Sequence, residues 1–98
     1  MSDECKVTVE AGVCKMNTVI LAKMNPETGM VDMEIQSDCP HVLRMTWTLQ
    51  PICPYTEVEA AMNETDIYKL ASGSLPHAAC PVPCGMVKAV EVAGGLGL

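Results

Sequence analysis

Aromatic side chains are almost missing from this 98-residue sequence, which has no Phe, one Trp and two Tyr. Aliphatic residues and eight Met must therefore fill the core, and Met packs adaptably but specifies the shape of a core only loosely. A chain of this length buries one modest core, so we expect a single domain over residues 1–98. Such a core would gain stability from an additional constraint, such as a bound metal.

Positive charge is also scarce, because six Lys and Arg stand against twelve Asp and Glu and give a net charge of −6. An acidic surface repels a phosphate backbone, so we expect no nucleic-acid partner. The apolar runs are far shorter than the roughly 20 residues that cross a bilayer, so we expect no membrane span. The first residues carry acids where a signal peptide carries basic and apolar side chains. We therefore predict an intracellular, cytoplasmic protein.

Several catalytic motifs are absent as well. The sequence has no glycine-rich phosphate loop, no Ser, His and Asp in a hydrolase order, and no His-Glu-x-x-His. Ordinary hydrolase chemistry therefore has no support. A binding domain is favoured over an enzyme, although the residue types alone leave that choice open.

The first third of the chain predicts a small antiparallel sheet. Residues 5–10 and 30–36 alternate apolar and polar side chains, and residues 18–23 form a further β-rich run. The segment from Asn25 to Gly29 has the Pro and Gly of a tight turn, so residues 18–36 are expected to form a hairpin.

The rest of the chain predicts short helices separated by an extended connector at residues 52–55. Pro40 and Pro81 mark helix starts, and Gly73 and Gly94 mark helix ends. Strands first and helices afterwards indicate an α+β domain, with helices packed on one face of a sheet of about three strands. The helices are expected over residues 40–50, over 60–62 behind a capping box at 56–59, over 63–70 and over 81–93.

Cysteine is abundant for so short a chain. An even number of cysteines is typical of a disulfide framework in a secreted domain, whereas in a reducing compartment dense cysteines are more often metal ligands or redox groups. Metal or sulfur chemistry is therefore the favoured interpretation, with disulfides and inert core thiols as alternatives. The six are Cys5, Cys14, Cys39, Cys53, Cys80 and Cys84.

Three of these cysteines lie where the predicted backbone turns. Cys14 follows the first strand, and Cys39 and Cys80 each precede a proline that would begin a helix, which makes both of them expected cap residues. At a helix start the unpaired amides and the helix dipole stabilise a thiolate, both as a nucleophile and as a metal ligand. We expect the three sulfur atoms to converge on one pocket.

Four other side chains near these turns are candidate metal ligands: Cys84, His41, His77 and Asp38. Cys84 follows Cys80 by four residues, which on a helix places both on one face. Each candidate also has an ordinary interpretation, as a small buried residue for Cys84, a surface group for the histidines and a helix-terminal charge for Asp38.

The remaining sulfur-containing side chains are predicted to be structural. Cys5 starts a strand, and Cys53 lies in a connector flanked by prolines. The methionines are scattered along the chain instead of clustered, which favours core filling over copper binding.

The order of strands, helices and cysteines resembles the iron–sulfur cluster assembly scaffold of the NifU/IscU type. The resemblance extends from Ala11 to Ala93. It implies that Cys14, Cys39 and Cys80 hold a transient iron–sulfur cluster or a zinc ion, and that a partner protein takes part in cluster or sulfur transfer. The implied fourth ligand is one of Asp38, His41, His77 and Cys84. The segments that carry the resemblance are residues 11–14, 37–40 and 77–80.

The sequence also departs from that family. Met16 and Ala79 stand where the family carries Asp and His, and the chaperone-docking motif Leu-Pro-Pro-Val-Lys is absent. The stretches 37–41 and 77–83 further resemble a set of small uncharacterised cysteine-containing proteins of anaerobic microbes. That second resemblance implies a setting rich in iron–sulfur chemistry and assigns no reaction.

Three functions follow as hypotheses. The favoured one is a non-catalytic domain that binds an iron–sulfur cluster or zinc through convergent cysteines, with metal binding contributing to folding. The second is a sulfur carrier or thiol redox protein that uses an activated Cys39 or Cys80. The third is a structural or interaction module with buried cysteines. The acidic surface and the segment 94–98 are compatible with a homodimer.

Overall fold

The computed structural model describes residues 3–96, so Gly97 and Leu98 of the segment 94–98 lie outside the described residues. In this range three strands precede four α-helices and a short 3-10 helix, η1. The α+β class predicted from the sequence is confirmed. In chain order the elements are β1 (Glu4–Glu10), β2 (Asn17–Asn25), β3 (Met30–Ser37), α1 (Pro40–Thr46), α2 (Pro54–Glu59), η1 (Met62–Glu64), α3 (Asp66–Ser72) and α4 (Val82–Ala93).

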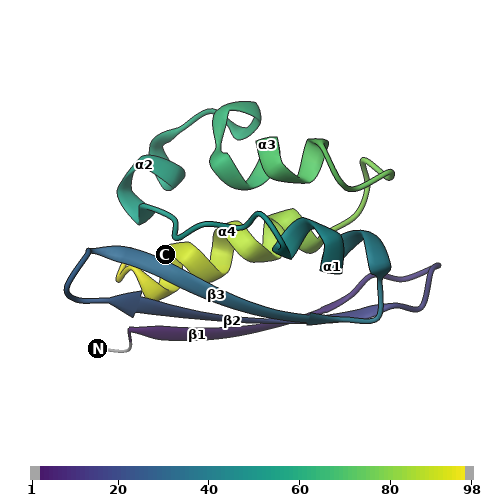
Figure 1. The fold of residues 1–98 in the computed structure, drawn as a ribbon, viewed down its shortest axis with the longest axis horizontal. Coiled ribbons are helices and arrows are strands. Elements are labelled where there is room, and N and C mark those ends of the chain that lie inside the picture. The colour runs from purple at the N-terminus through teal and green to yellow at the C-terminus, as the bar shows by residue number, and fades with distance from the viewer. Residues whose placement is uncertain (1–2, 97–98) are drawn as a thin grey trace.

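The strands form an antiparallel sheet in the order β1-β2-β3, with β2 in the centre (Figure 1). The predicted hairpin is confirmed, with Ile20 of β2 opposite Ile35 of β3. Its turn closes where the N–H of Gly29 donates to the carbonyl of Asn25 at 2.8 Å. Gly29 has a φ of 72°, a value that glycine adopts without the steric cost of a Cβ atom.

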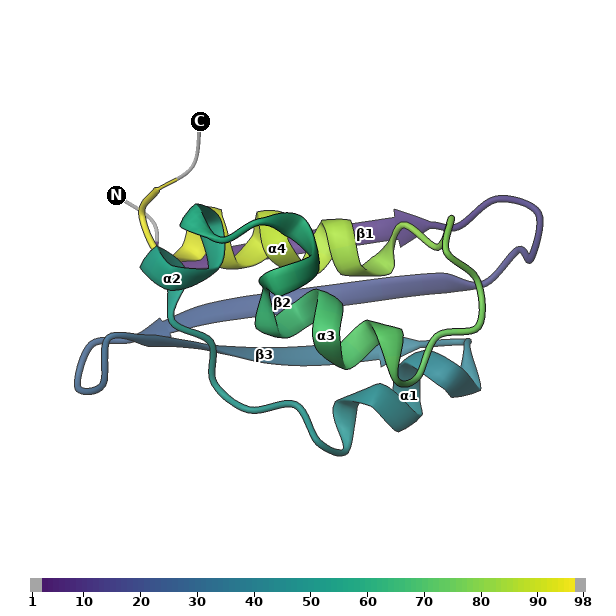
Figure 2. The same ribbon diagram turned by 90° about the horizontal axis from the view of Figure 1, so that it is seen from above.

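The two faces of the sheet differ in polarity because side chains alternate along each strand. Val9, Ile20 and Val31 are buried on the face that carries the helices. Lys6 and Glu34 lie on the other face, which the described residues leave uncovered. Figures 1 and 2 show all four α-helices on one side of the sheet, as the sequence predicted.

Helix α4 is the central helix, because it packs on β1 and β2 and also contacts α2 and α3. Two glycines permit its close approach. A Cβ atom at Gly85 would lie 3.0 Å from Val9 Cγ2, and one at Gly94 would lie 2.5 Å from Pro54 Cβ. Helix α1 packs beside β3 instead.

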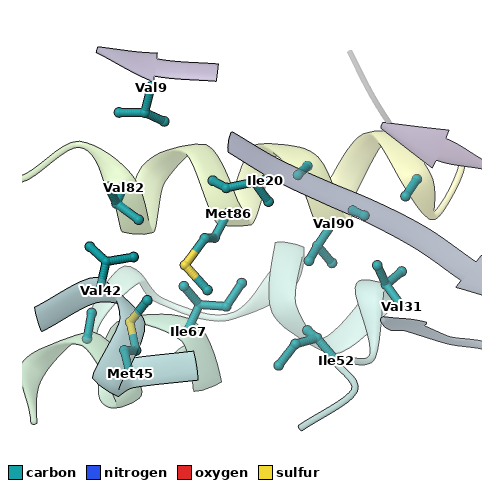
Figure 3. Close-up of a cluster of buried hydrophobic side chains, with 14 residues drawn as sticks. Val9, Ile20, Val31, Val42, Met45, Ile52, Ile67, Val82, Met86 and Val90 are labelled. Carbon is teal, nitrogen blue, oxygen red and sulfur yellow. The ribbon is translucent and has the colours of Figure 1, made fainter. Parts of the chain in front are cut away.

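The hydrophobic core fills the space between the sheet and the helices. Met45 and Met86 are fully buried, and Met86 of α4 points toward Ile67 of α3 (Figure 3). Flexible methionines thus occupy interior positions that aromatic residues fill in many other proteins.

Helix α1 ends earlier than predicted. It was expected to continue to residue 50, but its last residue is Thr46. The N–H groups of Trp47 and Thr48 bond to the carbonyls of Arg44 and Met45, three residues back, which tightens the final turn. Trp47 is 79% exposed, so no apolar packing extends the helix further.

The prediction for residues 52–62 is wrong. Helix α2 begins at Pro54, inside the expected extended connector, and ends at Glu59, before the expected helix 60–62. Proline is well suited to a first helical position because its fixed φ suits the helix and its missing N–H needs no partner there. Glu57, a middle residue of the expected capping box, bonds through its side chain to backbone amides of α3.

The later helices agree with the sequence more closely. Helix α3 begins at Asp66, after the separate helix η1 and later than the expected start at residue 63. Thr65 caps it, and the Thr65 hydroxyl accepts from the N–H of Tyr68 at 3.1 Å. The helix continues to Ser72, beyond the expected residue 70, and Gly73 closes it as predicted. Helix α4 ends at Ala93 as expected. None of the helices in the described part of the chain combines the length and apolarity that a bilayer crossing requires.

Candidate functional site

A pocket of about 470 Å³ opens where three distant chain segments meet at one end of the molecule. These segments are the β1–β2 loop, the start of α1 and the connector before α4, and they lie at the same end in Figures 1 and 2. The wall is largely apolar. Its lining residues include Ala11, Val13, Cys14, Met16, Thr18, Cys39, Pro40, His41, Val42, Leu75, Pro76, His77, Ala79, Cys80, Pro81 and Val82.

Cys14 lies in the turn that joins β1 to β2. The N–H of Lys15 donates to the carbonyl of Gly12 at 2.9 Å, and both residues have positive φ, 57° for Lys15 and 96° for Gly12. Cys14 is exposed and Val13 is fully exposed. This wall of the pocket therefore has little packing to hold it.

Cys39 is the N-cap residue of α1, as predicted, and its carbonyl accepts from the N–H of Leu43 at 3.1 Å. The N–H of Cys39 donates to the hydroxyl of Ser37 at 3.0 Å. That hydroxyl lies 2.7 Å from the hydroxyl of Thr18, so the start of α1 is tied to the central strand. Cys39 is half-buried and held by both contacts.

Cys80 does not cap α4, which corrects the sequence prediction. Pro81 is the N-cap, because its carbonyl accepts the bond from the N–H of Gly85 at 3.0 Å. Helix α4 therefore begins at Val82, one residue later than expected. The N–H of Cys80 donates to the carbonyl of His77 at 3.1 Å, and this turn brings both residues to the pocket.

The pocket thus gathers five of the seven predicted ligands. His41 and His77 line it together with the three cysteines and are exposed to solvent. Cys14, Cys39 and Cys80 thus line the same pocket, and the convergence of their sulfur atoms stays a prediction.

Asp38 and Cys84 do not line that pocket. The carboxylate of Asp38 accepts from the N–H of Asn17 at 3.1 Å, which fixes the corner between β3 and α1. Cys84 lines a second pocket with Tyr68, whose pKa is raised by burial and further by Cys84. The four-residue spacing fails to pair Cys84 with Cys80 because Cys80 lies before the helix.

The candidate ligand side chains do not form a complete metal-coordination shell in this structure. Within residues 3–96, no three His, Cys, Asp or Glu side chains lie close enough together to hold a metal ion. All six cysteines are free thiols. Cys5 is half-buried against the hydrophobic core, which agrees with its expected structural role.

Cys53 has a chemical environment that sequence reasoning missed. It is the N-cap of α2, and the hydroxyl of Thr56 donates to its sulfur at 3.4 Å. This side-chain bond, with the backbone N–H of Thr56, lowers the pKa of the Cys53 thiol below its ordinary value. The pair Cys53-Pro54 repeats the Cys-Pro pair at the start of α1, and that repetition is the signal that could have located it.

Comparison with known proteins gives a family and no function. No curated protein matches the sequence, and no solved structure does. A family of unknown function, DUF6951, matches residues 5–98, which include all the elements described above except the first residue of β1, and all five candidate ligands that line the pocket. The chain therefore belongs to the DUF6951 family.

Proposed function

We propose that this protein is a non-catalytic domain that binds an iron–sulfur cluster or a zinc ion in the pocket described above. Cys14, Cys39 and Cys80 are the proposed thiolate ligands. The observation that supports this proposal is that three cysteines from distant parts of the sequence line one pocket. If the cysteines were distributed at random, three of them would not be expected to line the same pocket.

The donor set suits these ligands chemically. Soft thiolates select zinc and iron–sulfur clusters among the metals of the cell, and imidazole is a suitable additional ligand for zinc and iron. His41 or His77 would supply the fourth position, since both line the pocket. Asp38 and Cys84 are not part of this proposal because their side chains are placed elsewhere.

Binding requires the Cys14 loop to move. In the described residues, no three candidate ligands lie close enough together to hold a metal. Cys39 is held in place because its N–H donates to the hydroxyl of Ser37 and because it caps α1. The loop at residues 11–16 is the exposed wall, and loops of this kind move on nanosecond to microsecond timescales. We propose that this loop closes on the two other cysteines when the ligand arrives.

A partner protein and a reducing compartment belong to the same proposal. An exposed, loop-bordered pocket suits a cluster or sulfur atom exchanged with another protein, as the resemblance to the NifU/IscU type implies. Six free thiols fit a cytoplasmic location, where thiols stay reduced.

Anaerobic reconstitution tests the proposal. The purified apoprotein is incubated with iron and sulfide or with zinc, and metal content and visible absorbance are measured after desalting. We expect stoichiometric binding by the wild type and loss of binding in the Cys14→Ser/Cys39→Ser/Cys80→Ser variant. Cys5→Ser and Cys84→Ser, singly, are matched controls that should bind normally. Equal binding by the triple variant, or none by the wild type, would overturn the proposal.

A sulfur carrier is the second candidate function, favoured by the open arrangement of the thiols. Here the thiolate of Cys39 or Cys80 attacks the outer sulfur of a donor persulfide, and the donor leaves as a thiolate. This function requires no metal. It predicts that one pocket cysteine reacts with iodoacetamide much faster than a free thiol at neutral pH, and that mass spectrometry detects one added sulfur on that residue.

A further inference from the structure

Strand β1 is an edge strand with an available hydrogen-bonding side. It pairs with β2 along its whole length, from Glu4 opposite Lys23 to Glu10 opposite Asn17. In an antiparallel pair half of the backbone N–H and C=O groups point to the neighbour and half point away. Among residues 3–96, no segment other than β2 forms a ladder with Cys5–Glu10. An edge of this kind is a template for another strand.

The opposite edge of the sheet is partly covered. Val31 of β3 exchanges two backbone bonds with Ile52, at 2.8 and 2.9 Å, and α1 packs beside β3. Figure 2 shows α1 lying along β3, while β1 forms the other border of the sheet. The two edges are therefore unequal, and β1 is the one available for pairing.

We propose that two copies of this chain associate through their β1 edges, antiparallel about a twofold axis at Thr8, to form one continuous sheet. In this register Lys6 lies opposite Glu10 of the partner subunit on the polar face of the sheet. On the helix-bearing face, Val7 lies opposite the partner's Val9. Neither Lys6 nor Glu10 forms an ion pair within the described chain, so both charges are available for the partner.

The charges of β1 disfavour the registers with the axis at Val7 or Lys6. Directly opposite residues of an antiparallel strand pair lie on the same face of the sheet, so the twofold axis between two identical strands must pass through a residue. The possible registers therefore differ by moving the axis one residue along β1. An axis at Val7 would place Glu4 opposite Glu10, and an axis at Lys6 would place Lys6 opposite its own copy. Like charges at directly opposite positions destabilise a strand pair.

An axis at Cys5 is the one other register nearby that pairs opposite charges, with Lys6 opposite Glu4. Glu4 already forms an ion pair with Lys23 at 3.4 Å. That register also leaves Thr8 and Glu10 without a strand residue opposite them. The Thr8 axis joins five residues of each strand, 6–10, and is the better match.

Sedimentation of charge variants tests the interface. We expect a wild-type dimer at micromolar concentration, and an increase of about tenfold or more in the dissociation constant for Lys6→Glu and for Glu10→Lys. The double variant Lys6→Glu/Glu10→Lys should dimerise again, and an equimolar mixture of the two single variants should form heterodimers. Lys69→Glu, an exposed change of equal charge on α3, is the matched control and should stay dimeric. Circular dichroism confirms that each variant is folded.

A disulfide test reports the register directly. In a Cys5→Ser background, Thr8→Cys should form a covalent dimer on mild oxidation. Dimerisation of the wild type through a Cys5–Cys5 disulfide, a monomeric wild type, or failure of the double charge exchange to restore the dimer would overturn the proposal. None of these readouts involves metal, so they are independent of the proposed binding function.

Discussion

Three Cys-Pro pairs occur in the chain, and each lies at the start of a helix. In two of them, Cys39-Pro40 and Cys53-Pro54, the cysteine is the cap residue, while at the third the proline takes that place. The two arrangements are indistinguishable in the sequence, because they differ only in whether the carbonyl of the cysteine or that of the proline accepts the first hydrogen bond of the helix. Sequence reasoning therefore locates these corners but does not determine which atoms lie at the cap.

At Cys53 we predict a reactive thiol. The hydroxyl of Thr56 lowers the pKa of Cys53, so its thiolate should form at lower pH than that of an unstructured peptide. The midpoint of its alkylation rate against pH, followed by peptide mass spectrometry, should be shifted downward accordingly.

Replacement of Thr56 provides the control for that prediction. Thr56→Val removes the hydroxyl donor and should move the midpoint of the alkylation profile upward, whereas Thr56→Ser keeps the donor and should leave it close to the wild-type value. An unchanged midpoint in Thr56→Val would show that the side-chain hydrogen bond is not the cause.

Among the elements, the strands were predicted far better than the short helices. Alternation of apolar and polar residues reports directly on a half-buried strand, and residues 5–10, 18–23 and 30–36 all lie in strands. Helix α2 has six residues, too few for a 3.6-residue period to be visible. Its position depends on contacts with α3 and α4 that a local pattern does not contain.

The contact between α2 and α3 depends on one buried carboxylate. The two oxygens of Glu57 accept from the N–H groups of Asp66 and Ile67, at 2.9 and 2.8 Å, and Glu57 is only 3% exposed. Glu57→Gln should replace one acceptor by a donor and lower the free energy of unfolding by about 1–3 kcal/mol. Glu59→Gln, at an exposed position of the same helix, should have little effect in the same urea titration.

The packing of α2 on α4 gives a second stability prediction. Gly94→Ala would place a methyl group 2.5 Å from the Pro54 ring, so the helices must separate, at a cost of about 1–3 kcal/mol. Gly73→Ala is the matched control, because its added methyl group meets only the Leu70 carbonyl at 3.6 Å. A thermal denaturation showing equal midpoints for the two variants would contradict the prediction.

At the scale of the whole molecule, sequence reasoning predicted which cysteines would line the pocket but not the apolar wall around them. The turn signals placed Cys14, Cys39 and Cys80 at chain corners, and the sheet topology brings those corners to one end. The apolar wall that includes Val42 and Leu75 was not foreseen, since both are ordinary core-type residues in sequence. Their role follows only from tertiary packing.

Metal binding at this pocket should stabilise the fold. A ligand that binds the native state alone adds about 2.7 kcal/mol at a free concentration 100 times its dissociation constant. Zinc or a reconstituted cluster should therefore raise the unfolding midpoint of the wild type by several degrees, by differential scanning calorimetry. The triple serine variant should show no such rise, while Cys84→Ser should respond like the wild type.

Cys14 lies in the turn between two strands of the sheet, whereas Cys39 and Cys80 lie just before helices α1 and α4, which pack on the other side of the core. A ligand held by all three would act as a cross-link between remote stretches of backbone, and cross-links act chiefly by restricting the unfolded chain. Loss of that ligand would then weaken the molecule everywhere at once. Proteases would degrade the empty form first, so the amount of protein in a cell would follow its supply of metal or sulfur.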